Sequence, residues 1–267
     1  MNRKNSAREI SRFLDPYRIT SGRKFRLKDH DPGDTGGLGS EDKPEAKRML
    51  ATGIERMADL QEKLYASDEW GVLLVFQAMD AAGKDGTIKH VLSGVNPQGC
   101  QVHSFKQPSA EEMDHDFLWR SQRVPPRLVG KKVWEERLED IAAYERYLAR
   151  NGFAILKFFL NVSRKEQKRR FLERLDEPEK HWKFSAADVR ERSHWKDYME
   201  AYEEAIRATA TTHAPWFVVP ADEKWFTRLV VAAAIVETLE GLDLSFPKVD
   251  DAQRKELALA RAQLAKE

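Results

Sequence analysis

Apolar positions along the chain predict an alternating series of helices and strands. The first pattern has helical spacing and predicts a long helix that begins near Pro44, with one buried face formed by Leu50, Ile54, Met57, Leu60 and Leu64. Nearly continuous apolar runs at 71–78, 153–162 and 216–219 are typical of buried strands. Helical patterns cover 83–95, 131–150 and 222–241. Because strands alternate with helices, we expect an α/β fold, a three-layer α/β/α sandwich around a parallel sheet.

The remaining segments have weaker patterns. Residues 1–43 contain few apolar positions and a run rich in glycine and aspartate, so we expect an N-terminal arm or extended loop. Residues 100–105 alternate like a short strand. Helices from 109 to 122 and from 163 onwards should each begin with a capping box. A main domain is therefore expected at 44–247, followed by a charged, peripheral helix within 248–267.

The segment between the first strand and the next helix has the character of a phosphate-binding loop. Small residues follow the strand, and Lys84 comes just before the helical pattern. The backbone N–H groups of such a turn point inward and bind phosphate oxygens, while the helix N-terminus and the lysine add positive charge. We predict that this loop holds phosphate through Ala81, Ala82, Gly83, Lys84, Asp85, Gly86 and Thr87.

This loop departs from the usual pattern at two positions. Ala78 stands where the first glycine is expected, and Asp85 stands where a hydroxyl would bind magnesium. Asp80 and Asp85 could offset the missing hydroxyl, because Mg²⁺ (or Mn²⁺) is held by oxygen ligands at such sites. The alternative interpretation is an ordinary strand-to-helix turn with a solvated lysine.

Composition limits the classes of protein that the chain could be. The formal net charge is only +1, which argues against a nucleic-acid-binding protein. No apolar run approaches the ~20 residues of a membrane helix, and the first residues lack an apolar signal core. The single cysteine, Cys100, excludes an internal disulfide and fits a reducing, cytoplasmic setting. We interpret Cys100 as a packing residue.

A second group of residues points to phosphate chemistry. The segment 168–195 is rich in arginine and lysine, with Pro178 at an expected bend between two helices. Helical hairpins of this kind act as lids in phosphoryl-transfer enzymes, where arginines neutralise charge that develops in the transition state. We therefore predict a lid at about 164–200 that contributes Arg170, Arg174 and Lys183. The alternative is a surface hairpin whose charges are solvated.

Together these motifs resemble the polyphosphate kinase 2 family. The loop sequence Gln-Ala-Met-Asp-Ala-Ala-Gly-Lys-Asp-Gly-Thr-Ile at 77–88 carries much of the likeness. Further matching motifs keep their order along the chain, at 25–28, 31–35, 94–97, 117–120, 156–160, 176–184, 214–217 and 237–240. The residues of these motifs are most similar to those of the branch that accepts nucleoside mono- and diphosphates.

The resemblance implies a P-loop kinase-like fold, Mg²⁺, and transfer of a terminal phosphoryl group between inorganic polyphosphate and an adenine or guanine nucleotide. It also implies a homo-oligomer. We expect Asp80, Lys84 and Arg174 to be catalytic, and Asp80 and Asp85 to hold the metal. Weaker candidates for binding polyphosphate are Lys24, Lys28, Lys106 and Arg120.

One departure from the family bears on activity. Family members carry a strand and loop after the motif at 117–120, whereas here 120–127 runs straight into the segment before the next helix. Either the given residues leave out a disordered segment, or the protein lacks it. We favour the first explanation, because loss of a central strand would leave backbone groups unpaired. A real deletion would favour an inactive polyphosphate- or nucleotide-binding subunit; the other alternative is a nucleotide kinase that uses a nucleoside triphosphate.

Overall fold

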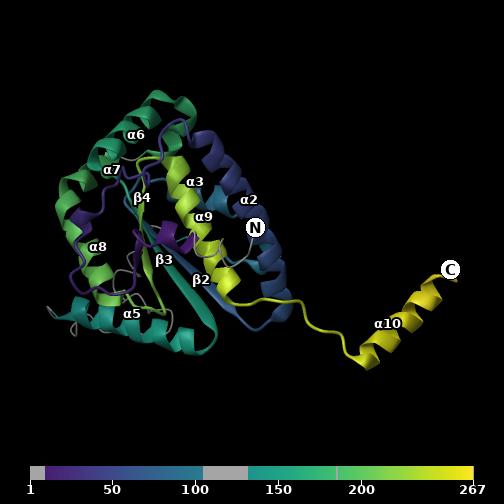
Figure 1. Ribbon diagram of the computed structural model, residues 1–267. Coiled ribbons are helices and arrows are strands. Elements are labelled where there is room, and N and C mark those ends of the chain that lie inside the picture. Colours follow the sequence, from purple (N-terminus) through teal and green to yellow (C-terminus); the bar gives the residue numbers. More distant parts are fainter. Residues whose placement is uncertain (1–9, 105–131, 185, 267) are drawn as a thin grey trace.

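The computed structural model describes residues 10–104, 132–184 and 186–266 of the chain (Figure 1). Its main body is a small sheet with helices around it, and a C-terminal helix stands apart from that body. Three features of the sequence analysis lie outside the described residues. They are the helix predicted at 109–122, the point where the family strand is missing, and the N-terminal end of the predicted arm.

Three parallel strands form the centre of the body. They are β2 (Gly71–Ala78), β3 (Phe153–Asn161) and β4 (Trp216–Pro220), and the short strand β1 (Arg18–Ile19) pairs with β4 in the antiparallel sense. The order across the sheet is β1-β4-β3-β2. Ala78 lies opposite Leu160, and Leu160 lies opposite Val219, so all three parallel strands end at the same edge of the sheet. The predicted parallel strands are confirmed.

Side chains alternate between the two faces of the sheet, and each face belongs to a separate apolar cluster. Phe158 and Phe217 belong to the larger cluster, which includes residues of α2 (Lys43–Ser67) and α9 (Lys224–Gly241). Phe159 belongs to the smaller cluster, which includes Ile206 of α8 (Trp195–Thr209). Successive residues of a strand point to opposite faces, so helices cover both faces of β3.

The other helices follow the predicted order with shifted ends. Ser163 caps its helix as expected, since its Oγ accepts a hydrogen bond from the N–H of Glu166 at 3.0 Å. The reciprocal bond of the predicted capping box is absent from this cap, because the Glu166 carboxylate binds Arg169 and Arg170 instead. The bounds are α3 (Lys84–Val91), α5 (Val133–Arg150), α6 (Arg164–Asp176), α7 (Ala186–Glu191) and α10 (Asp251–Leu264), with 3-10 turns at Leu27–Asp29, Pro97–Gly99, Pro178–Lys183 and Arg192–His194.

The segment before α2 contributes to the body although little of it is regular. Leu14, Tyr17, Phe25 and Leu27 are buried. The backbone N–H of Leu27 donates to the carboxylate of Glu203 at 2.8 Å, which joins the segment to α8. Much of the expected extended loop is therefore held in place by apolar burial.

The prediction of a strand at 100–105 is wrong for the residues that the structure describes. Residues 100–104 have no regular structure, and Val102 is 73% exposed. Cys100 is exposed too, so our interpretation of it as a packing residue is also wrong. A strand requires a neighbour for its backbone groups. Among the described residues β2 pairs with β3 alone, so β2 is the edge strand of this sheet.

The C-terminal helix α10 is a separate feature. Asp250 and Gln253 form a complete capping box at its start. None of its described side chains is buried, and Figure 1 shows it away from the body at the end of an extended segment. Within the described ranges, no helix is long and apolar enough to span a membrane.

Candidate active site

The predicted loop lies between β2 and α3, at the edge where the parallel strands end. The N–H of Ala82 donates to the carbonyl of Met79 at 3.1 Å and closes the turn. Ala81 and Gly83 have positive φ angles of 61° and 100°. Gly83 therefore occupies a conformation that side chains other than glycine rarely adopt. The strand, the turn and the helix that a phosphate loop requires are all present.

Helix α3 begins at Lys84, so its first N–H groups face the loop without partners inside the helix. Lys84 is half-buried, Asp85 is exposed and Thr87 is buried. The Thr87 N–H is already used, because it donates to the Gly83 carbonyl at 2.9 Å. Thr87 therefore contributes to the shape of the loop, whereas the earlier N–H groups and the Lys84 ammonium form its positive end.

Arg170 of α6 supports the loop from behind. Its Nη1 donates to the carbonyls of Ala81 and Ala82 at 3.0 and 2.8 Å, and its Nη2 donates to the carbonyls of Ala221 and Asp222 at 2.7 and 3.0 Å. This guanidinium is only 5% exposed. We predicted Arg170 as a lid residue that closes over the phosphates. The structure corrects this, because its donors already bind loop carbonyls.

Gln167 extends this support by one turn of α6. Its Nε2 donates to the carbonyl of Asp80 at 2.8 Å, and its Oε1 accepts from Arg192. The carbonyls of residues 80, 81 and 82 are thus all bound by side chains of α6. We call Gln167 and Arg170 the loop brace. Because the brace fixes the carbonyls, it also fixes the orientation of the neighbouring N–H groups, which is the requirement for a preorganised anion site.

Arg174 is the predicted lid residue that the structure brings to the loop. Its Nη1 lies 3.3 Å from Oδ2 of Asp80. The Arg174 and Asp80 side chains are 21% and 52% exposed, so the pair is open to solvent and contributes little to stability. Both groups are therefore available to a ligand. The helix that follows Pro178 is confirmed, but the side chain of Lys183 lies outside the described part.

The acidic residues of the loop are suited to a partly hydrated metal ion. Asp80 is half exposed and its carboxylate binds one arginine, while Asp85 is exposed in the first turn of α3. Among the described residues, no three histidine, cysteine or acidic side chains form a metal-binding group. Magnesium keeps several waters and commonly takes one or two carboxylates plus substrate phosphates. The two aspartates therefore fit such an ion, and they would not fit an all-protein metal centre.

A hollow of about 750 Å³ lies at the carboxyl end of β3, the edge of the sheet where β2 also ends before the loop. The predicted residue Lys28 lines it, together with Ser163 and Arg164 at the start of α6. Trp195 and Met199 of α8 supply apolar surface. Lys24 is not among the lining residues, and Lys106 and Arg120 fall in the undescribed stretch. Of the two polyphosphate candidates that the structure describes, Lys28 lines this hollow and Lys24 does not.

Two residues after β4 belong to the site and were missed from the sequence. Oδ1 of Asp222 accepts the N–H of Ser163 at 2.7 Å, which joins the end of β4 to the start of α6. Lys224 follows at the start of α9, and burial followed by the nearby Arg170 lowers the pKa of its ammonium. The available signal was their position, because residues just after parallel strands gather at one edge of the sheet.

Comparison with known proteins agrees with this geometry. The profile of the family described as Polyphosphate kinase 2 (PPK2) matches residues 40–133 and 126–247. The chain belongs to the polyphosphate kinase 2 family. The crystal structure of polyphosphate kinase 2 from Arthrobacter aurescens TC1 superposes with a TM-score of 0.79 at 40% identity, covering 91% of this chain and 96% of that one.

Two curated relatives extend the likeness over most of the chain. An ADP-polyphosphate phosphotransferase of Rhodopseudomonas palustris is 48% identical, covering 85% of this chain and 90% of the relative. An AMP/ADP-polyphosphate phosphotransferase of Meiothermus ruber is 43% identical, covering 91% and 98%. This member of the polyphosphate kinase 2 family is therefore similar to these two relatives over most of its length.

The alignments also concern the strand and loop that are missing near residue 127. The alignment with the Rhodopseudomonas protein has 260 positions but includes 85% of these 267 residues, about 227, so some 30 positions have no residue here. The two matched stretches of the family profile meet at 126–133, near the same point. The given sequence therefore has no counterpart for these positions of the relative.

Proposed function

We propose that this protein transfers a terminal phosphoryl group between inorganic polyphosphate and AMP or ADP. The observation that carries the proposal is the braced loop: Lys84 and the N-terminus of α3 face the same edge of the sheet as Arg174. Positive groups on a rigid frame suit a reaction in which catalysis is mostly positioning and charge stabilisation. The names of the relatives support polyphosphate and adenine nucleotides as the substrates.

Each residue then has a defined part. The loop N–H groups other than those of Ala82 and Thr87, which already bind carbonyls, bind the phosphate oxygens. Lys84 neutralises the phosphates on either side of the transferred group. Asp80 and Asp85 would hold Mg²⁺ directly or through water, and the ion would neutralise charge on the phosphate oxygens. Arg174, in the last turn of α6, moves its guanidinium from Asp80 toward the transferred group as the turn that follows α6 closes. The proposal includes a three-layer fold with this helical lid.

The substrates that the protein uses distinguish the proposed function from its alternatives. Product formation is measured with ADP plus long-chain polyphosphate and, separately, with AMP plus ATP. Turnover with polyphosphate supports the proposal, and turnover with ATP alone indicates a nucleotide kinase. Turnover in neither assay, with retained polyphosphate binding, indicates a binding subunit, the reading that the missing segment favours. A homo-oligomer and a cytoplasmic location are parts of the proposal that sedimentation and cell fractionation test.

Asp80→Asn is expected to raise the Mg²⁺ concentration needed for half-maximal activity, because an amide is a weaker ligand for a hard cation than a carboxylate. Asp59→Asn, an exposed substitution on α2, is the matched control and should leave the metal dependence unchanged. If Asp80 only shapes the turn, asparagine would preserve its local hydrogen bonds, and the two variants would show the same metal dependence.

Arg174→Ala is expected to lower kcat much more than it raises KM for either substrate, because we assign its charge to the transition state. Steady-state kinetics with each substrate varied in turn measures both constants. If Arg174 only attracts polyphosphate, KM for polyphosphate would rise instead, and high salt acting on the wild type would imitate the substitution. Unchanged constants would remove Arg174 from the mechanism.

A further inference from the structure

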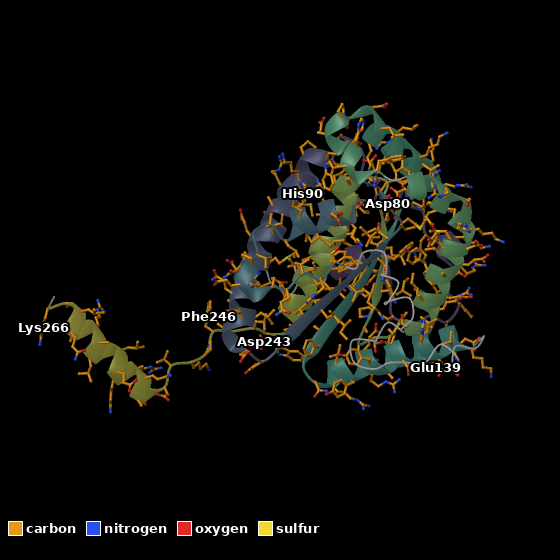
Figure 2. All side chains as sticks on the ribbon, turned by 180° about the vertical axis from the view of Figure 1, so that it is seen from behind. Asp80, His90, Glu139, Asp243, Phe246 and Lys266 are labelled. Atoms are coloured by element: carbon orange, nitrogen blue, oxygen red, sulfur yellow. The ribbon has the colours of Figure 1, made fainter. Side chains whose placement is uncertain are left out.

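A second group of positive side chains lies at the opposite end of the body from the loop. It lines a hollow of about 470 Å³ formed by Arg146, Ala149, Arg150 and His213. The first three belong to the end of α5, just before β3 begins, and His213 comes just before β4. Figure 2 shows the two ends of the body, with Asp80 of the loop at one and Glu139 of α5 at the other.

The charges in this hollow have no counterpart within the described structure. Neither Arg146 nor Arg150 forms an ion pair with any described residue, and no acidic side chain lines the hollow. Lys157 of β3 adds positive charge nearby, but its ammonium is already bound to Glu145 at 2.5 Å and to the Thr209 carbonyl at 2.8 Å. The hollow is therefore electropositive, with two guanidinium groups one helical turn apart.

His213 provides a second, independent observation. Its Nε2 is buried and has no hydrogen-bond partner. Burial lowers the pKa of the imidazole, and the charges of Arg146, Lys157 and Arg150 lower it further. The two arginines could serve only to interact favourably with the negative end of the α5 helix dipole. That explanation does not account for an orphaned ring nitrogen, since a buried polar atom without a partner is costly.

We propose that this hollow binds a phosphate-bearing anion, held by the guanidinium groups of Arg146 and Arg150 and by Nε2 of His213. Forked guanidinium donors match phosphate oxygens, and an imidazole N–H would complete the contact. The anion is either free phosphate or the end of a polyphosphate chain. Because a bound anion favours the protonated ring, the affinity should rise as the pH falls through the pKa of His213.

The test uses the Lys84→Ala protein, so that binding at the loop is weakened first. Calorimetric titration with tripolyphosphate should still detect a site. Adding Arg146→Ala and Arg150→Ala should weaken it at least about tenfold, a loss of about 1.4 kcal/mol. The matched control is Arg254→Ala with Arg261→Ala, two exposed arginines on α10, which should leave the affinity unchanged. Equal weakening in both double variants would overturn the proposal.

His213→Gln gives a separate measurement that removes no guanidinium, and it serves if the double variant does not fold. Tripolyphosphate should bind the Lys84→Ala protein more tightly at pH 6 than at pH 8, and His213→Gln should abolish that difference. A gain in affinity at pH 6 that persists in the variant, or equal binding of citrate, would contradict the site. Within a supported site, orthophosphate binding of similar strength identifies free phosphate as the anion, and binding of chains alone identifies polyphosphate.

Discussion

Replacing Lys84 by alanine is expected to reduce phosphoryl transfer by on the order of 10²–10³ while the fold stays intact. Lys84 begins α3 at the end of the loop, where one ammonium can meet oxygens of several phosphates. A preorganised charge in this position acts most strongly where negative charge develops in the transition state. The loop hydrogen bonds do not involve its side chain, so the loss should be confined to binding and catalysis.

Turnover with ADP and polyphosphate is the measurement, with thermal unfolding as the test of the fold. Lys89→Ala is the matched control, because Lys89 is an exposed lysine on the same helix and should be nearly silent. Near wild-type turnover of the Lys84 variant at unchanged thermal stability would contradict the assignment of the phosphate loop.

Arg170→Ala is expected to destabilise the protein by about 3–5 kcal/mol, because it removes a buried charge whose partners remain in place. Four backbone carbonyls would lose their donor, and the Glu166 carboxylate would keep Arg169 alone of its two arginines. Each unsatisfied buried acceptor carries a desolvation penalty. The loop would lose its brace as well, so affinity for phosphate should fall together with stability.

Arg169→Ala is the control for this prediction, since Arg169 is the adjacent residue and also binds Glu166. Its side chain is 54% exposed, and exposed ion pairs contribute about 0–1 kcal/mol. Urea unfolding of both variants measures the difference between them. Equal and small losses of stability would show that the brace does not hold the loop.

Much of the fold was predictable because its signals are local. The strand β2 matches its predicted bounds, and the apolar runs at β3 and β4 located those strands to within one residue. The short pattern at 100–105 failed because a few alternating residues do not make a strand without a partner edge. The burial of Tyr17 and Phe25 was missed because the first 43 residues contain few apolar positions and end in a glycine- and aspartate-rich run, which suggested an exposed loop.

The candidate site was predictable in its chemistry and less so in its geometry. The sequence indicated the loop from its small residues and Lys84, since that motif is continuous along the chain. It could not separate Arg170 from Arg174, which lie one helical turn apart on α6. Only the packing of α6 on the loop decides that one guanidinium is buried against carbonyls and the other remains open to solvent.

The long range of the brace has a consequence for the order of events on the ribosome. Arg170 comes 89 residues after Ala81, and β3, the one described partner of β2, also comes much later in the chain than β2. The loop should therefore resist protease only after α6 has been made. Two nascent chains test this expectation, one stalled with residues up to 150 exposed and one stalled with residues up to 200 exposed, and only the longer chain should have a protected loop. Until β3 has been made, the apolar strand β2 has no partner for its backbone groups. We therefore expect the loop to become ordered late in synthesis, and the nascent chain to need protection from aggregation before that point.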